Sequence, residues 1–438
     1  MTDIADRPVH SADPVDEVNA WLKESWDPDL TVADWWERLG TSGWAAPSWP
    51  SDAYGRGLSR SDGVRVQRAI AEFGALGAPG GLGLLLAGPT IAVHGTPEQK
   101  ERYLRDIVTG QKAWCQLFSE PQAGSDLAGL QTKAVKDGDV WVCNGQKVWT
   151  SGGQIADLGM LIARTNPEAP KHQGITYFAI DMHQPGCDIR PLKEMTGRAL
   201  FNEVFLTDAT VEDAAIIGGL GNGWAVANTT LAFERAGLGA GGGSAEGGSA
   251  TPGSVARDLD KRVGDFVKQG AKRRGGPGGL AGMQQVIQGL AQDNGKLKDP
   301  LVRQDLMRLY SMNEIARFST LRQKGLAAQG KDMPGFGNIA KLTMSNILRL
   351  SRDLGLRVLG PLGMLHAYPG QDREALDKAT GNPFAGIITE AALFSQGPPI
   401  YGGTDQIQRN IIGERVLGLP KEPGPAKETP FRELPKNG

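Results

Sequence analysis

The sequence is poor in cysteine and carries no excess of either charge. Three cysteines, Cys115, Cys143 and Cys187, are scattered over 438 residues, too few for a disulfide framework or a zinc site. We therefore expect buried free thiols in a reducing compartment and no bound metal. The formal net charge is −2, so no basic field indicates a nucleic acid or an anionic lipid surface as a partner.

Long hydrophobic runs are also missing. Residues Met1 to Val15 are polar and acidic and contain no apolar core of a signal peptide. The most apolar window, Gly80 to Val93, is shorter than a membrane span and is interrupted by Gly88 and Pro89. With 40% hydrophobic and 22% charged residues, the composition is that of an ordinary globular protein. We expect a soluble cytoplasmic protein with no membrane span.

The pattern of the chain changes twice, which predicts a mainly α protein with a central β domain. Up to about Lys112 it indicates helices, and Thr96 to Gln99 form a capping box. Short β runs follow, typical of a small barrel or sandwich. Strands are expected at 140–143, 159–163, 175–180 and 204–206, with turns at 137–139 and 144–145. Helical periodicity returns after Trp224, with amphipathic stretches at 301–328, 339–359 and 385–394.

These changes predict domain boundaries. The N-terminal helical domain is expected at residues 1–112, the β domain at 113–212 and the C-terminal helical domain at 213–420. The tail, 421–438, is rich in Pro, Lys and Glu, so we expect it to be disordered or draped on the surface.

A glycine-rich insertion, residues 237–253, interrupts the C-terminal helices. It contains a formal G-x-G-x-x-G at Gly237, Gly239 and Gly242, but a dinucleotide fingerprint requires a preceding strand, and helix precedes it here. The same objection excludes a dinucleotide-binding fingerprint at Gly276 and Gly278. The basic triplet 272–274 has no interleaved aromatics and is best interpreted as a solvated turn.

Three segments have the chemistry of a flavin site. Residues 116–126 (QLFSEPQAGSD) form a turn-rich stretch whose backbone N–H groups and hydroxyls can bond a ring edge or a phosphate. Residues 144–151 (NGQKVWTS) offer an indole for stacking and a hydroxyl. Residues 401–410 (YGGTDQIQRN) place a capping threonine at a helix start, which favours an anion. Taken singly, each segment has a structural alternative: a hairpin corner, a buried tryptophan or a helix cap.

Together and in this order, the three segments resemble the acyl-CoA dehydrogenase family, collinearly from about Asp34 to Leu419. Supporting matches are residues 40–50, 201–204 and 221–224. The resemblance implies an N-terminal helical domain, a β domain and a C-terminal four-helix bundle around non-covalent FAD. It also implies a homodimer or homotetramer that oxidises an acyl-CoA to the trans-2-enoyl-CoA in lipid β-oxidation. Electrons would pass to electron-transfer flavoprotein.

The resemblance also assigns roles to individual residues. Those expected to contact FAD or the thioester are Gln116, Phe118, Ser119, Gly124, Ser125, Trp149, Ser151, Thr404 and Gln406. Ser125 also lies where family members bind the substrate.

Two departures from the family pattern matter. Many relatives carry the catalytic glutamate directly after the tyrosine of the last segment, where this chain has Gly402. A minority branch carries it on a helix of the C-terminal domain, immediately before an arginine. Glu234 is therefore the candidate base, and Arg235 the residue that shapes or polarises the substrate pocket.

The second departure is a missing Arg-x-x-Phe-Gly segment, which in many relatives grips the FAD pyrophosphate across a subunit interface. Arg303 and Arg357 are weak candidates to replace it. The altered region keeps two other hypotheses open. One is a subunit of a hetero-oligomeric dehydrogenase that is inactive without its partner, and the other is a flavin oxidase or monooxygenase on the same fold.

Overall fold

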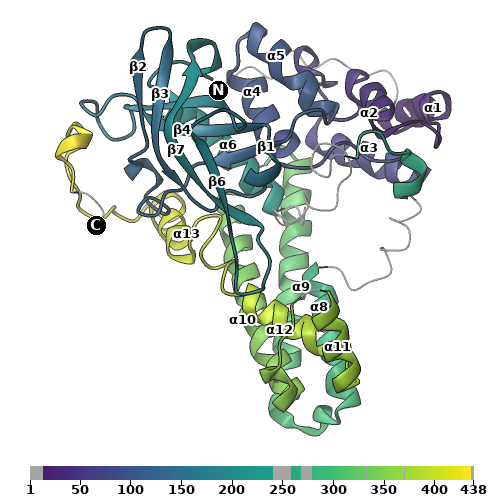
Figure 1. The fold of residues 1–438 in the computed structure, drawn as a ribbon. Coiled ribbons are helices and arrows are strands. Elements are labelled where there is room, and N and C mark those ends of the chain that lie inside the picture. The colour runs from purple at the N-terminus through teal and green to yellow at the C-terminus, as the bar shows by residue number, and fades with distance from the viewer. Residues whose placement is uncertain (1–12, 240–257, 268–278, 332, 369, 436–438) are drawn as a thin grey trace.

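The computed structural model describes residues 13–239, 258–267, 279–331, 333–368 and 370–435. Within these ranges, a helical part, a curled β-sheet and a second helical part follow one another along the chain (Figure 1). The predicted fold class, mainly α with a central β domain, is confirmed. The domain boundaries stay predictions. The glycine-rich insertion beyond Gly239 and the basic triplet 272–274 lie outside the described residues.

The N-terminal helices pack around two adjacent tryptophans. Trp35 and Trp36 are fully buried, and their indole N–H groups donate to the backbone oxygens of Leu76 and Gly77 at 2.7 and 2.8 Å. The capping box at Thr96 is confirmed. The helices of this part are α1 (Pro14–Ser25), α2 (Val32–Thr41), α3 (Arg60–Phe73), α4 (Gly88–His94) and α5 (Pro97–Val108), with the π-turn η2 (Gly83–Ala87).

The central sheet has the strand order β1-β4-β2-β3-β7-β6, with β5 added on β4. Its strands are β1 (Trp114–Leu117), β2 (Lys133–Asp137), β3 (Val140–Lys147), β4 (Leu158–Arg164), β5 (Ile175–Asp181), β6 (Cys187–Leu192) and β7 (Phe201–Glu212). All four predicted strands are present. The pairing of β1 with β4 is parallel, so the segment after β1 lies beside the segment after β4 at one edge of the sheet.

One of the two predicted turns is a turn and the other is not. Asp137 pairs with Val140 across a tight hairpin, with Gly138 at φ 55°. Asn144-Gly145 instead lies inside β3, where the register against β7 shifts by a bulge. A Cβ atom at Gly145 would come within 2.4 Å of the Thr132 hydroxyl, so the glycine serves close packing rather than chain reversal.

The C-terminal helices begin with α6 (Gly223–Gly239), which packs against β5, α4 and α10. The others are α8 (Gly279–Asp293), α9 (Pro300–Ala328), α10 (Phe336–Leu359), α11 (Gln371–Thr380), α12 (Ala385–Phe394) and α13 (Asp405–Ile411), which continues as the π-turn η9 (Ile412–Val416). Helices α8, α9, α10 and α12 share a hydrophobic core separate from the larger one under the sheet. Figure 1 shows this bundle projecting away from the β domain.

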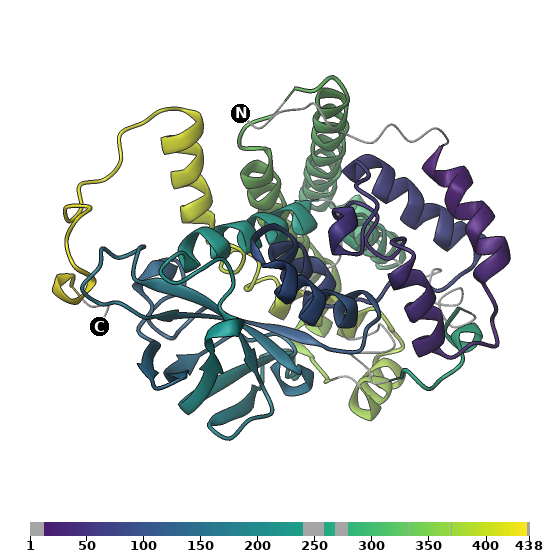
Figure 2. The ribbon, with the colours of Figure 1, turned by 90° about the horizontal axis from the view of Figure 1, so that it is seen from above.

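For the tail, two alternatives were predicted, disorder or draping on the surface, and its contacts at Phe431 and Arg432 agree with the second. The Phe431 ring lies 3.4 Å from the guanidinium carbon of buried Arg164, and Arg432 pairs with Glu168 at 2.8 Å. Backbone bonds from Phe431 and Arg432 to the 167–169 segment complete the contact. Figure 2 shows this C-terminal segment leaving α13 and reaching the β domain. No helix in the described ranges is both long and apolar enough to cross a membrane.

Candidate active site

The first predicted segment is held by a buried ion pair. Lys147 at the end of β3 is fully buried and lies 2.8 Å from Glu120, whose side chain is 5% exposed. The Glu120 carboxylate also accepts from the backbone N–H groups of Gln131 and Thr132, and Lys147 donates to the carbonyl of Phe118. Because these charges are paired and hydrogen-bonded, the loop after β1 has a fixed shape.

The two charges shift each other's ionisation. Burial raises the pKa of Glu120, but the adjacent Lys147 ammonium and the backbone donors outweigh it and hold the pKa below its usual value. Burial lowers the pKa of Lys147, and Glu120 opposes that shift. Both residues lie within the predicted segments, but the sequence pattern assigned neither of them a role. Opposite charges in two segments expected to meet were the signal that could have identified the pair.

The second predicted segment lies beside the first. The N–H of Val148 donates to the carbonyl of Ser119 at 2.9 Å, which brings Trp149 next to the loop after β1. Trp149 has a left-handed backbone, φ 61°, and its side chain is 61% exposed. For a bulky residue this is an unfavourable conformation, and here it turns the indole outward. Its ring meets the ring of Phe201 edge to face, with the ring centroids 5.8 Å apart.

The remaining residues of these two segments have different environments. Phe118 is buried against Tyr177, with the ring centroids 5.9 Å apart, so its side chain belongs to the core. Ser151 and Ser119 are partly buried. Gly124 and Ser125 are exposed on the turn that follows Glu120, and a Cβ at Gly124 would meet nothing within 4 Å. A substrate can therefore approach this turn.

Glu234 lies on α6 and is partly buried. Burial raises the pKa of its carboxyl group, while the carboxamide of Gln116 and the guanidinium of Arg235 partly offset the rise. Gln116 is thus beside Glu234, which joins β1 of the first segment to the predicted base. The Nε2 atom of Gln116 is buried with no hydrogen-bond partner of normal geometry in the described part of the chain.

Arg235 is exposed. Desolvation lowers the pKa of its guanidinium, Glu234 raises it, and Arg415 of η9 lowers it. Arg415 is therefore close, which brings η9, the turn that follows the third segment, towards α6. Of the two weak candidates for the pyrophosphate, Arg303 is exposed, whereas Arg357 is engaged with Asp305 at 2.5 Å.

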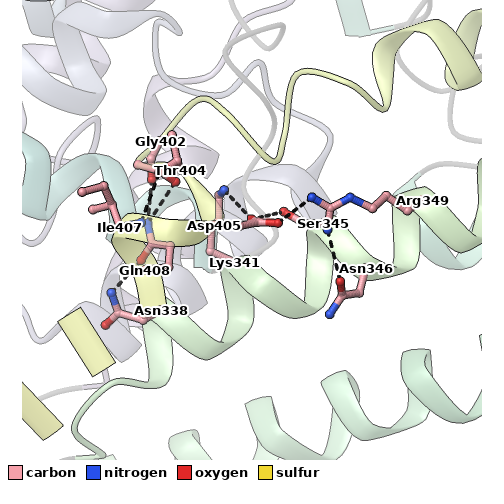
Figure 3. Close-up of polar contacts among 11 residues, drawn as sticks. Asn338, Lys341, Ser345, Asn346, Arg349, Gly402, Thr404, Asp405, Ile407 and Gln408 are labelled. Carbon is pink, nitrogen blue, oxygen red and sulfur yellow. Dashed lines mark hydrogen bonds and ion pairs between the residues drawn. The ribbon is translucent and has the colours of Figure 1, made fainter. Parts of the chain in front are cut away.

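The third predicted segment is fixed to α10, as Figure 3 shows. The hydroxyl of Thr404 accepts from the N–H of Ile407, so the predicted cap is confirmed. The next residue, Asp405, is 2% exposed and binds Lys341 at 3.0 Å, Ser345 at 2.9 Å and Arg349 at 2.7 Å. Gln406 is exposed.

A second contact holds the glycine turn. The Gln408 amide donates to the carbonyls of Gly402 and Gly403, and its oxygen accepts from Asn338 at 2.6 Å. The roles of Asp405 and Gln408 were missed because the sequence does not show that α10 passes beneath them.

The residues of the first two segments fit a flavin. The buried hydroxyl of Thr150 has no hydrogen-bond partner within the described ranges, and neither does the buried Nε2 of Gln116 apart from its interaction with Glu234. Unpaired buried polar atoms are costly, and a ligand with a polar edge would satisfy them. The exposed indole of Trp149 adds a flat apolar surface for stacking. A planar heteroaromatic ring matches this combination.

Comparisons with known proteins agree with this chemistry. The family models for the N-terminal, middle and C-terminal domains of acyl-CoA dehydrogenase match residues 13–111, 115–209 and 279–417. The chain is 35% identical over 392 residues to acyl-CoA dehydrogenase IpdE1 of Mycobacterium tuberculosis, covering 89% of this chain and 88% of that protein.

Solved structures give the same result. The fold is similar to that of the ChsE4-ChsE5 complex from Mycobacterium tuberculosis, with a TM-score of 0.65 and 27% identity, covering 96% of this chain and 100% of that one. A variant of the Tcur3481-Tcur3483 steroid ACAD also has a TM-score of 0.65, at 25% identity, with 93% and 98% covered.

Proposed function

The chain belongs to the acyl-CoA dehydrogenase family, and from this premise we propose that Glu234 removes the α-proton of an acyl-CoA thioester. FAD is the cofactor, and when bound it supplies the hydride acceptor. The observation that carries the proposal is the partly buried carboxyl group of Glu234, with its raised pKa, beside Gln116. A base near its operating range is most effective, and desolvation moves a carboxylate in that direction.

The other predicted residues complete the proposed site. Ser125 and Arg235 are assigned to the substrate, where the exposed turn and the guanidinium are open to a thioester and its charged carrier. Stabilising the enolate-like charge on the thioester oxygen requires donors placed before the reaction. The residues proposed to hold FAD are Gln116, Phe118 (through its backbone), Ser119, Gly124, Ser125, Trp149, Ser151, Thr404 and Gln406.

Replacing Glu234 by Gln tests the base. This change keeps the shape and removes the proton acceptor, so FAD content should be retained while turnover falls about 10²–10⁴-fold. Visible absorbance measures bound FAD, and an artificial electron acceptor measures turnover. Glu212→Gln, an exposed carboxylate on β7, is the matched control and should keep full activity. Normal turnover of Glu234→Gln would remove Glu234 from the mechanism.

We further propose a bulky, polycyclic acyl group as the substrate and electron-transfer flavoprotein as the electron acceptor. A relative at 25% identity is described as a steroid ACAD. In addition, the proposed base lies on an inner helix, so the position directly after Tyr401 carries no carboxylate and leaves that space open to the acyl group. Anaerobic bleaching of the flavin by a panel of acyl-CoA thioesters measures this preference. Faster bleaching by straight short chains than by steroid-derived ones would contradict it.

A second candidate function is that of one subunit in a mixed assembly. The observation that favours it is an apolar surface on α9, made by Met307, Tyr310, Phe318 and Leu321, which are 50–57% exposed. The opposite face of α9, with Val302, Leu306 and Leu309, is already buried in the bundle. A helix that is apolar on both faces is normally covered, so we propose that another subunit, identical or homologous, covers it.

A further inference from the structure

The helix that carries Glu234 has a buried polar contact one turn before that residue. Val226, Ala227 and Thr230 of α6 are all fully buried. Residues four apart lie on the same face of a helix, so Thr230 and Glu234 share a face, about 6 Å apart along the axis. A shift of the helix at Thr230 would therefore also move Glu234.

Thr230 belongs to a hydroxyl cluster, defined here as Thr90, Tyr177 and Thr230. The Thr230 hydroxyl lies 3.0 Å from that of Thr90 on α4 and 3.4 Å from that of Tyr177 on β5. It also donates to the carbonyl of Val226 at 3.2 Å. A threonine hydroxyl has one donor and two acceptor sites, so with its proton on Val226 it can accept from both partners. All three of its sites are then used.

The cluster joins three parts of the chain that are far apart in sequence: the N-terminal helices, the sheet and α6. Its members are buried to 1% exposure or less, where hydrogen bonds are stronger and an unmade one costs more than in water. Burial also raises the pKa of the Tyr177 phenol, so Tyr177 stays neutral and keeps its proton as a donor. The cluster therefore holds α6 in place at Thr230 and does not change its charge with pH.

A second fixed point lies at the start of α6. A Cβ atom at Gly223 would come within 2.5 Å of the Thr176 backbone, so the helix N-terminus is pressed directly against β5. That point lies about 17 Å along the axis from Glu234. The hydroxyl cluster is much nearer to Glu234. Because its hydrogen bonds have defined distances and angles, it fixes both the rotation of α6 and its position along its axis more strictly than apolar packing alone does.

We propose that Thr230, held by Thr90 and Tyr177, is a positioning residue that sets the reach of Glu234 to the substrate carbon. The proposal rests on the proposed function of Glu234 as the base. A general base must lie within hydrogen-bond distance of the proton it takes, and an error of about 1 Å costs about 10²-fold in rate. The same contact also connects to the flavin loop, because Tyr177 packs on Phe118.

Thr230→Val tests the proposal, because it removes the hydroxyl and keeps the branched shape. We expect FAD content and KM to stay unchanged while kcat falls about tenfold to 10²-fold, and Thr230→Ser to restore most of kcat. Thr229→Val is the matched control. Its hydroxyl bonds His94 at 2.8 Å and belongs to no bond of the cluster, so kcat should not change. Tyr177→Phe, which removes one donor only, is the second variant if Thr230→Val does not fold.

The outcomes separate this proposal from the assignment of the base. Turnover that survives Glu234→Gln overturns the base, whatever the Thr230 variants do. If Glu234→Gln is inactive but Thr230→Val and Tyr177→Phe both keep the parent kcat, the base stands and the positioning role is wrong. Adding Thr230→Val to Glu234→Gln should lower the residual rate no further, and an equal further loss would show that Thr230 acts on something other than Glu234.

Discussion

At the scale of single residues, Glu234 combines the two properties that a carbon acid requires of its base. It is desolvated enough to have a raised pKa, and it remains accessible from one side because burial is partial. The Lys147–Glu120 pair is the contrast. It is more deeply buried than Glu234, but its two charges satisfy each other, so it holds a loop and performs no chemistry.

The raised pKa of Glu234 predicts the acid side of the pH–rate profile. Only the ionised carboxylate accepts a proton, so turnover should fall with decreasing pH through a midpoint above the usual glutamate value of 4.5. The measurement is kcat/KM against pH with an artificial electron acceptor. A midpoint at or below 4.5 would contradict a desolvated base.

The same shift has an opposite effect on stability. A carboxyl whose folded pKa exceeds its unfolded pKa stabilises the fold at low pH, and this contribution is lost as pH rises through the folded pKa. Glu234→Gln should therefore raise Tm at pH 7 and leave it nearly unchanged at pH 4, which provides a control independent of activity.

At the scale of elements, the third segment depends on one carboxylate that lies between two helices. Asp405 opens α13 and binds Lys341 and Arg349 of α10. Burial raises the pKa of Asp405, but Lys341, Ser345 and Arg349 outweigh it and hold the pKa below its usual value. The charge therefore stabilises the fold above the unfolded pKa, and this stabilisation is lost as pH falls through the folded pKa.

Asp405→Asn should consequently loosen α13 from α10. Removing one partner of a buried pair costs about 3–5 kcal/mol, because Lys341 is left buried without its counter-charge. We expect a lower Tm and weaker retention of FAD on dilution, measured by calorimetry and by flavin fluorescence. Asp353→Asn is the control on the same helix α10, since its side chain is 57% exposed beside Arg352. Equal effects of the two variants would disprove the anchoring role.

At the scale of the whole molecule, the bundle exposes four large apolar side chains along one face of α9, namely Met307, Tyr310, Phe318 and Leu321. Helix α9 belongs to the bundle that projects away from the β domain (Figure 1). Contiguous exposed apolar patches mark association sites.

Met307→Glu combined with Phe318→Glu should dissociate the assembly. Placing two charges in the covered surface removes its hydrophobic contribution and leaves them desolvated, so the mass measured by light scattering should fall to that of a single 46.6 kDa chain. Val64→Glu, an isolated exposed residue on α3, should leave the mass unchanged. An unchanged mass of the double variant would show that α9 is not the interface.

The fold was largely predictable because its signals are local. The capping box at Thr96, the Gly138 hairpin and the period of α9 and α10 each depend on neighbours within a few residues. The Asn144-Gly145 turn was predicted wrongly for the same reason. Two turn-forming residues indicate a reversal locally, but β7 pairs across them and converts the site into a bulge.

Sequence alone determined the family, the three-part fold and the flavin cofactor, since these depend on residue types at set spacings along the chain. Tertiary structure decided which groups meet. Only the tertiary structure places Gln116 beside Glu234, Lys147 beside Glu120 and Lys341 beside Asp405. It also places the Phe431 ring against Arg164. The physical reason is that burial and charge pairing depend on distances through space, between residues 27 to 267 positions apart in the chain.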